Sequence, residues 1–104
     1  MAYDRLSKDL SRESRYALRL LLARALNKNQ ILLLSKIDGS AYSLSSFLRR
    51  LSKESGVPIS TLKMNAGVLR KLDLIRFSSF GIRTRSTVEL SEAGAIMLNI
   101  IMEK

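Results

Sequence analysis

The chain has 104 residues and a formal net charge of +9, because 18 Lys and Arg residues stand against 9 Asp and Glu residues. This length predicts one domain that can bury a core without disulfide or metal staples. The sequence contains no Cys and no His, which excludes disulfide and thiolate chemistry, a Cys/His zinc site and a His general base. Its longest apolar runs, such as residues 20–23, have four residues, whereas a membrane span needs about 18. With no signal-peptide pattern at the N-terminus, we expect a cytoplasmic protein with no membrane partner.

The first third of the chain predicts two helices. Ser11 is placed to cap a helix over residues 11–27, in which leucines and alanines form a wide apolar face and arginines occupy much of the remainder. A second helix is expected over residues 30–37, and Gly39 suits the position just after its end. Residues 41–44 are expected to form a short strand.

Two further helices are predicted in the middle of the chain. Ser45 is expected to cap a helix over residues 46–54, and a glycine ends it. Ser60 is expected to cap the next helix, over residues 60–72, because Pro58 cannot stand in a helix interior. The expected core positions of these two helices follow helical spacing; they are Phe47, Leu48, Leu51, Leu62, Ala66, Leu69 and Leu72.

After Asp73 the pattern changes to the period of a strand. Residues 74–79 and 83–90 predict an antiparallel hairpin with a short tip that contains glycine. Alternation in the second strand places its apolar residues on one face, and Arg83 and Arg85 on the other. The chain as a whole is therefore expected to be mainly α with a small β-hairpin.

The last helix is expected over residues 92–103, with Ser91 as its cap and Glu92 in its first turn. This helix is apolar almost all round, and a helix of that kind must be covered on every side. The helix over residues 11–27 is also rich in leucine. We therefore expect more apolar surface on the two terminal helices than a core of this size needs.

Positive charge gathers in two parts of the chain. Residues 43–90 carry nine basic and three acidic side chains, and residues 1–28 carry seven basic and three acidic ones. Residues 29–42 are balanced, and residues 91–104 carry a net −1. Such asymmetry is typical of a protein that binds nucleic acid. Taken alone, the charge is explained equally well by solubility.

The order of the predicted elements, together with residues 60–76, resembles a winged helix-turn-helix domain of the ArsR type and of related archaeal regulators. The segment STLKMNAGVLRKLDLIR resembles the recognition-helix signature S-T-(apolar)-S-R-H-L-K-V-L-R-x-x-G-L-(V/I)-R. It matches this signature at Ser60, Thr61, Val68, Leu69, Arg70, Leu74, Ile75 and Arg76. Residues 90–94, LSEAG, are similar to the L-T-x-x-G that follows the wing. The resemblance covers about residues 29–95 and implies a nucleoid-associated transcriptional regulator that binds double-stranded DNA.

Three departures limit what the resemblance implies. Asp73 stands where the family has a Gly, and Asp tolerates left-handed backbone less well. The connection over residues 53–59 is longer than the minimal turn. The Cys and His ligands of metal-sensing members are absent, so the resemblance implies DNA binding without a metal or other cofactor.

The resemblance places the helix over residues 60–72 in the major groove. Its predicted outward residues are Thr61, Lys63, Met64, Asn65, Gly67 and Lys71. Asn65 can bond adenine at two points, and Lys63 can donate to guanine. Gly67 permits either close approach of DNA or close packing against the helix over residues 46–54. Predicted phosphate contacts are the helix starts and the basic side chains beside the groove and on the wing: Ser45, Ser60, Arg49, Arg50, Lys53, Arg70, Lys71, Arg83 and Arg85.

The terminal helices of this family commonly form a two-fold interface, so the resemblance also implies a homodimer. The residues expected in that interface are Leu18, Leu21, Leu22, Ile96, Met97, Ile100 and Ile101. The alternative is that the N-terminal helix covers only the last helix of its own chain.

An enzyme is not expected, because the carboxylates are scattered and neither a G-x-S-x-G motif nor a phosphate-binding glycine spacing occurs. Two other binding functions stay open. One is a winged-helix module that assembles proteins, which is expected to present apolar or acidic residues outward on the helix over residues 60–72. The other is an architectural chromatin protein that binds DNA without reading its sequence. The absence of Cys and His, with many Leu, Ile and Arg residues, fits an archaeal or thermophilic source.

Overall fold

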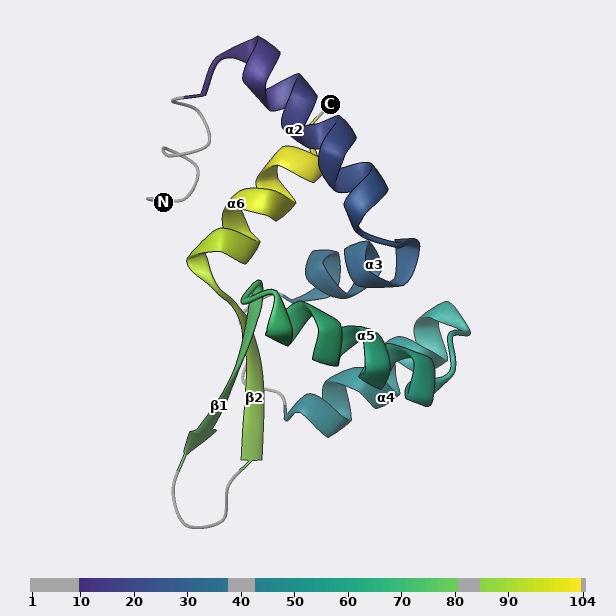
Figure 1. Ribbon diagram of the computed structural model, residues 1–104. Helices are drawn as coiled ribbons and strands as arrows, with labels where there is room; N and C mark the ends of the chain where they lie inside the picture. The colour runs from purple at the N-terminus through teal and green to yellow at the C-terminus, as the bar shows by residue number, and fades with distance from the viewer. Residues whose placement is uncertain (1–9, 38–42, 81–84, 104) are drawn as a thin grey trace.

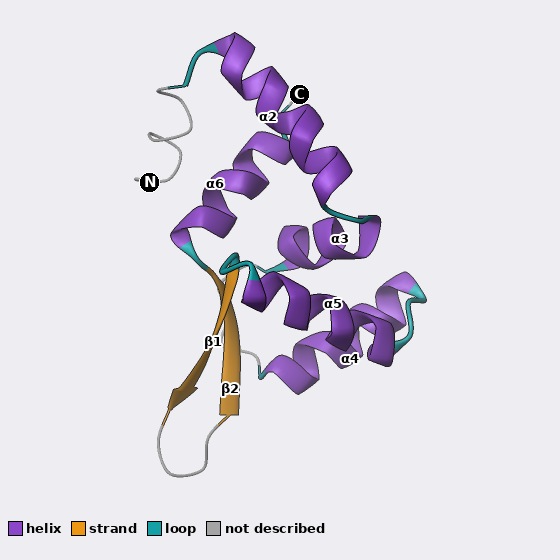
Figure 2. Ribbon diagram, in the orientation of Figure 1, coloured by secondary structure: helices purple, strands orange, loops and turns teal. Residues whose placement is uncertain are grey.

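The computed structural model describes residues 10–37, 43–80 and 85–103. These residues form five helices and one antiparallel pair of strands (Figures 1 and 2). The elements follow in the order α2 (Arg12–Ala25), α3 (Lys28–Lys36), α4 (Leu44–Ser55), α5 (Ile59–Lys71), β1 (Ile75–Phe80), β2 (Arg85–Leu90) and α6 (Glu92–Ile101). The predicted class, mainly α with a small β-hairpin, is confirmed.

Helix α5 lies at the centre of the molecule, between α3 and α4 and against β1 (Figure 1). Helices α2 and α6 pack on one another to form an arm at the end opposite the hairpin (Figure 1). The core lies between α3, α4, α5 and the base of the hairpin. Its most deeply buried large side chains include Leu33, Leu34, Leu62, Leu69 and Ile75.

Most predicted core positions of α4 and α5 are buried, but one prediction is wrong. Phe47, Leu48 and Leu51 form the inner face of α4, as helical spacing predicts. Leu72 was expected in the core but is 54% exposed. It is the C-cap of α5, and the chain turns away at Asp73, which adopts a left-handed conformation with φ of 60°. The turn leaves Leu72 at the edge of the buried face.

Side-chain caps begin four of the five described helices. Ser11, Asn27, Ser43 and Ser91 each accept a hydrogen bond from a backbone N–H three residues further on. Each bond satisfies a donor that the first helical turn leaves without an intrahelical partner. The predicted caps Ser11 and Ser91 are therefore confirmed.

The other two predicted caps, Ser45 and Ser60, are wrong, since both lie inside the first turns of their helices. An isolated bridge to Thr87 holds Ser43 in extended backbone, the conformation that a cap requires, so α4 starts earlier than expected. Of the expected strand over residues 41–44, Ser43 forms only this bridge and Leu44 already begins α4, so the strand prediction is wrong there; residues 41–42 lie outside the described residues. Helix α5 starts directly after Pro58, whose fixed φ and missing N–H are tolerated at a helix start.

The hairpin pairs Ile75 with Leu90 at its base and Phe80 with Arg85 at the far end of the described strands. Val88 is buried and its neighbour Glu89 is exposed, so the predicted alternation holds near the core. The predicted tip lies largely outside the described residues, as does Arg83. The strands extend away from the helices (Figure 2).

The junction between the hairpin and α6 is tightly packed. The backbone N–H of Ser91 donates to the carbonyl of Leu74 over 3.0 Å, and the Ser91 hydroxyl donates to the carbonyl of Asp73 over 2.6 Å. Gly94 packs so closely that a Cβ there would overlap the Leu74 carbonyl oxygen. The glycine that follows the hairpin is therefore required by this close approach.

Candidate functional site

Helix α5 has one buried and one open face. Leu62, Ala66 and Leu69 point into the core. On the other side Lys63 and Lys71 are exposed, and Met64 is the most exposed large apolar residue described, at 66%. Helix α4 packs against α5 and exposes Arg49 and Arg50. The structure thus brings most of the basic and polar residues predicted to bind onto these two adjacent helices.

Asn65 does not belong to the open face, and the prediction that it reads a base is wrong. Its side chain is 4% exposed. The Asn65 side chain accepts hydrogen bonds from Asn27 and Gln30 and donates one to the backbone carbonyl of Thr61. The amide is therefore used inside the protein. Thr61 itself is half-buried.

Gly67 lies on the open face, and nothing stands within 4 Å of where its Cβ would be. Close packing against α4, one of its two expected roles, is therefore excluded. The backbone of α5 is accessible at this point.

Arg70 connects α5 to the hairpin. Its guanidinium lies 5.0 Å from the centre of the Phe77 ring in β1, a distance typical of a cation–π contact. The side chain is still exposed, so it keeps donors for another partner. Arg85 is the first residue of β2, where its backbone pairs with Phe80. Its side chain is not among those that the structure describes.

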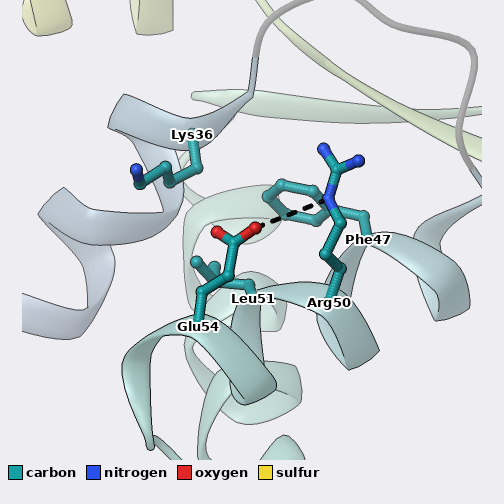
Figure 3. Close-up of a pocket in the computed structure, with 5 residues that line it drawn as sticks. All are labelled: Lys36, Phe47, Arg50, Leu51 and Glu54. Atoms are coloured by element: carbon teal, nitrogen blue, oxygen red, sulfur yellow. Dashed lines mark ion pairs between the residues drawn. The ribbon is translucent and has the colours of Figure 1, made fainter.

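A shallow hollow of about 220 Å³ lies between α3 and α4, lined by Lys36, Phe47, Arg50, Leu51 and Glu54 (Figure 3). Arg50 and Glu54 face one another along α4, with 3.9 Å between Arg50 Nε and Glu54 Oε1 (Figure 3). Both side chains are about half exposed, so the pair contributes at most a few tenths of a kcal/mol. Glu54 is the acidic residue beside this otherwise basic surface, and it offsets part of the charge that Arg50 brings.

Four apolar side chains of α5 and its C-cap are exposed, and the sequence predicts only one of them, Met64, to point outward. The others are Ile59, Val68 and Leu72. Met64, Val68 and Leu72 recur every four residues and so share one side of the helix. Helical spacing does not reveal that Val68 and Leu72 are exposed, because Val68 lies beside the core positions and Leu72 fits their spacing.

The arm carries a second basic cluster. Arg15 Nε lies 2.9 Å from Glu103 Oε2, and Arg19 donates to the Glu103 carbonyl over 2.9 Å. With Arg12 and Tyr16 these residues line an open hollow of about 310 Å³. The contacts tie the start of α2 to the end of α6.

The expected interface residues on the arm differ in exposure. Leu21 is 62% exposed, whereas Ile100 is 1% exposed within its own protomer. Ile100 therefore cannot contribute to a surface between protomers, and that prediction is wrong. The remaining expected residues are half-buried; they are Leu18, Leu22, Ile96, Met97 and Ile101.

Within the described ranges, no group of three or more acidic, Cys or His side chains is placed to hold a metal ion. No helix in this part of the chain has the length and apolarity to cross a bilayer. No family model, curated protein or solved structure matches the chain.

Proposed function

We propose that the protein is a winged helix-turn-helix regulator that binds double-stranded DNA sequence-specifically, with α5 in the major groove. The observation that carries this proposal is the open face of α5, where Lys63, Met64, Gly67 and Lys71 are accessible on a helix held from behind by α3 and α4. No residue of α5 is acidic. A single helix of this kind fits the major groove, where Lys can donate to guanine and Met can contact a thymine methyl.

The start of α5 supports a phosphate contact. Its N-cap, Pro58, provides no side-chain hydrogen bond, and Ser60 in the first turn is exposed. Backbone N–H groups at an uncapped helix start, together with the helix dipole, favour an anion. Arg49 on α4 and Arg70 on α5 would flank the groove in the same binding mode. The sequence assigns Arg83 and Arg85 the same role.

The proposed regulator acts as a homodimer through the arm. Helix α2 has no buried residue, and Tyr16, Leu20 and Leu21 are exposed on it. Arg15 and Arg19 are held toward Glu103. A two-fold axis through α2 would pair identical surfaces. Binding to half-sites one turn of DNA apart would require the two α5 helices to lie about 34 Å from one another.

Fluorescence anisotropy with two labelled duplexes across a salt series tests the proposal. One duplex carries the DNA just upstream of the protein's own gene, and the other a scrambled sequence of equal composition. We expect a preference of about 10³-fold or more for the first. About six to eight phosphate contacts per protomer predict a slope of log K against log salt of roughly −5 to −7.

The exposed apolar stripe of Met64, Val68 and Leu72 favours a second function, protein assembly through the same face of α5. The same experiment separates the two functions. An absence of binding to either duplex at low salt would contradict the nucleic-acid function and support the assembly module. Equal and strongly salt-dependent binding of both duplexes would instead indicate an architectural protein.

A further inference from the structure

Three amide side chains from two separate parts of the chain, the start of α3 and the middle of α5, meet where these helices pack together. Asn27 is the N-cap of α3 and stands at the corner where α2 ends, Gln30 lies in the first turn of α3, and Asn65 lies in the middle of α5. Asn27 Nδ2 lies 3.0 Å from Asn65 Oδ1, and Gln30 Nε2 lies 3.2 Å from the same oxygen. Gln30 and Asn65 are buried.

Further hydrogen bonds join the members of this amide cluster to one another and to the backbone, with Asn27 at the exposed edge of the cluster. Asn27 Oδ1 accepts from the Gln30 backbone N–H over 2.8 Å, and Gln30 Oε1 accepts from the Asn27 backbone N–H over 3.0 Å. Asn65 Nδ2 donates to the Thr61 carbonyl over 2.8 Å. Among the described residues that are not exposed, every fully buried side-chain polar atom has a partner. A network with all its members satisfied specifies a unique geometry.

An amide is not the simplest way to fill this part of the core. An apolar side chain of the same volume would stabilise packing without the cost of burying polar groups. What the amides add is direction, because hydrogen bonds weaken steeply when their angles change. The cluster therefore specifies how the corner between α2 and α3 is oriented relative to α5.

We infer that Asn65 is a positioning residue, which through Asn27 and Gln30 sets the angle between the arm and α5. In the homodimer, that angle determines the distance between the two α5 helices and so the half-site spacing that the dimer accepts. The role of Asn65 in setting the half-site spacing, its spacing role, rests on the proposed function. Its role in setting the angle between the arm and α5, its angular role, does not.

The angular role is tested within one protomer. The chain has no cysteine, so Ala23→Cys on α2 and Lys53→Cys on α4 accept two spin labels at exposed positions. Labelled protein is diluted into unlabelled protein, so that only distances within one protomer are measured. The distribution of distances between the two labels is then measured by pulsed electron–electron double resonance. Asn65→Leu is expected to broaden or shift this distribution. Asn29→Leu, a matched change beside the cluster, is expected to leave it unchanged.

A second variant tests the same role in case Asn65→Leu fails to fold. Asn27→Ser keeps a capping oxygen but removes the donor to Asn65, and it is expected to change the same distance distribution in the same direction. If both Asn65→Leu and Asn27→Ser fold and keep the native distribution, Asn65 has no positioning role.

The spacing role is tested by anisotropy on duplexes whose half-sites are moved apart one base pair at a time. We expect the native protein to prefer its best spacing by roughly tenfold over a one-pair shift, and Asn65→Leu to lose most of that preference. An unchanged spacing preference in a variant with an altered distance distribution would overturn the spacing role. Failure of the native protein to bind any duplex would contradict the proposed function and the spacing role, while the spin-label distances still decide the angular role.

Discussion

In the proposed DNA-binding mode, base reading by α5 depends most directly on Lys63. It is exposed on the open face, one turn from the uncapped helix start. The sequence predicts a base contact for Asn65 as well, but in the structure the Asn65 side chain is hydrogen-bonded within the amide cluster. Lys63 is left as the residue of α5 whose side chain can donate to a base edge near the helix start.

Lys63→Ala is expected to weaken binding to the specific duplex by about 1–3 kcal/mol and to weaken binding to the scrambled duplex less. Lys28→Ala removes the same charge from an exposed position at the start of α3, outside α4, α5 and the hairpin, and serves as the control. Anisotropy at fixed salt measures both. An equal loss on the two duplexes for Lys63→Ala would mean that the side chain contacts phosphate and not a base.

Two helical glycines differ in how closely other parts of the chain approach them. Gly67 and Gly94 both lie inside helices. A Cβ at Gly67 meets open space, whereas a Cβ at Gly94 overlaps the backbone carbonyl of Leu74. Backbone cannot move aside as a flexible side chain can, so the two positions should respond oppositely to the same substitution.

Gly67→Ala is expected to raise the free energy of unfolding by about 0.5–1 kcal/mol, because Ala is the better helix former. Gly94→Ala is expected to lower it by about 1–3 kcal/mol, because α6 must shift away from the hairpin. Urea unfolding followed by circular dichroism measures both changes. A neutral or stabilising Gly94→Ala would contradict the close approach between α6 and the hairpin.

The arm exposes apolar side chains that no other described part of the chain covers. Helix α2 has no buried residue, and packing on α6 leaves Leu20 and Leu21 in contact with solvent. Exposed apolar patches of this kind mark interaction sites in soluble proteins. A second protomer explains the surface without another partner, since a two-fold contact uses the same patch twice.

If the proposed homodimer forms through the arm, Leu21→Asp is expected to convert it into a monomer, because the change would bury an unpaired carboxylate in the interface. The substitution should not unfold the protomer, since Leu21 is already exposed. Met64→Asp places the same charge at an exposed apolar residue of α5 and should leave the oligomeric state unchanged. Light scattering measures the mass of each variant. A dimer that survives Leu21→Asp would place the interface elsewhere.

Features that act over a few residues could be predicted from the chain. The order of helices and strands, the caps Ser11 and Ser91 and the inner face of α4 all follow from periodicity and capping within one or two turns. The exposure of Lys63, Met64 and Lys71 on α5 follows from the same periodicity, whereas Asn65 was expected to be exposed and is buried. Local preference also explains the misplaced cap of α4, because Ser43, Ser45 and Ser46 stand close together and each satisfies the rule. At α5 the helix starts directly after Pro58 and has no side-chain cap.

The remaining features depend on residues that are distant in sequence. Asn65 is buried where α3 packs on α5, and Asn27, 38 positions away, donates to its side-chain oxygen. Ser43 rather than Ser45 caps α4 because a bridge to Thr87 holds it extended. Ile100 is enclosed by its own protomer, and Gly94 meets the backbone of Leu74. Periodicity identifies the face of a helix but not the partner that covers its edge, so these contacts appear only once the elements are packed together.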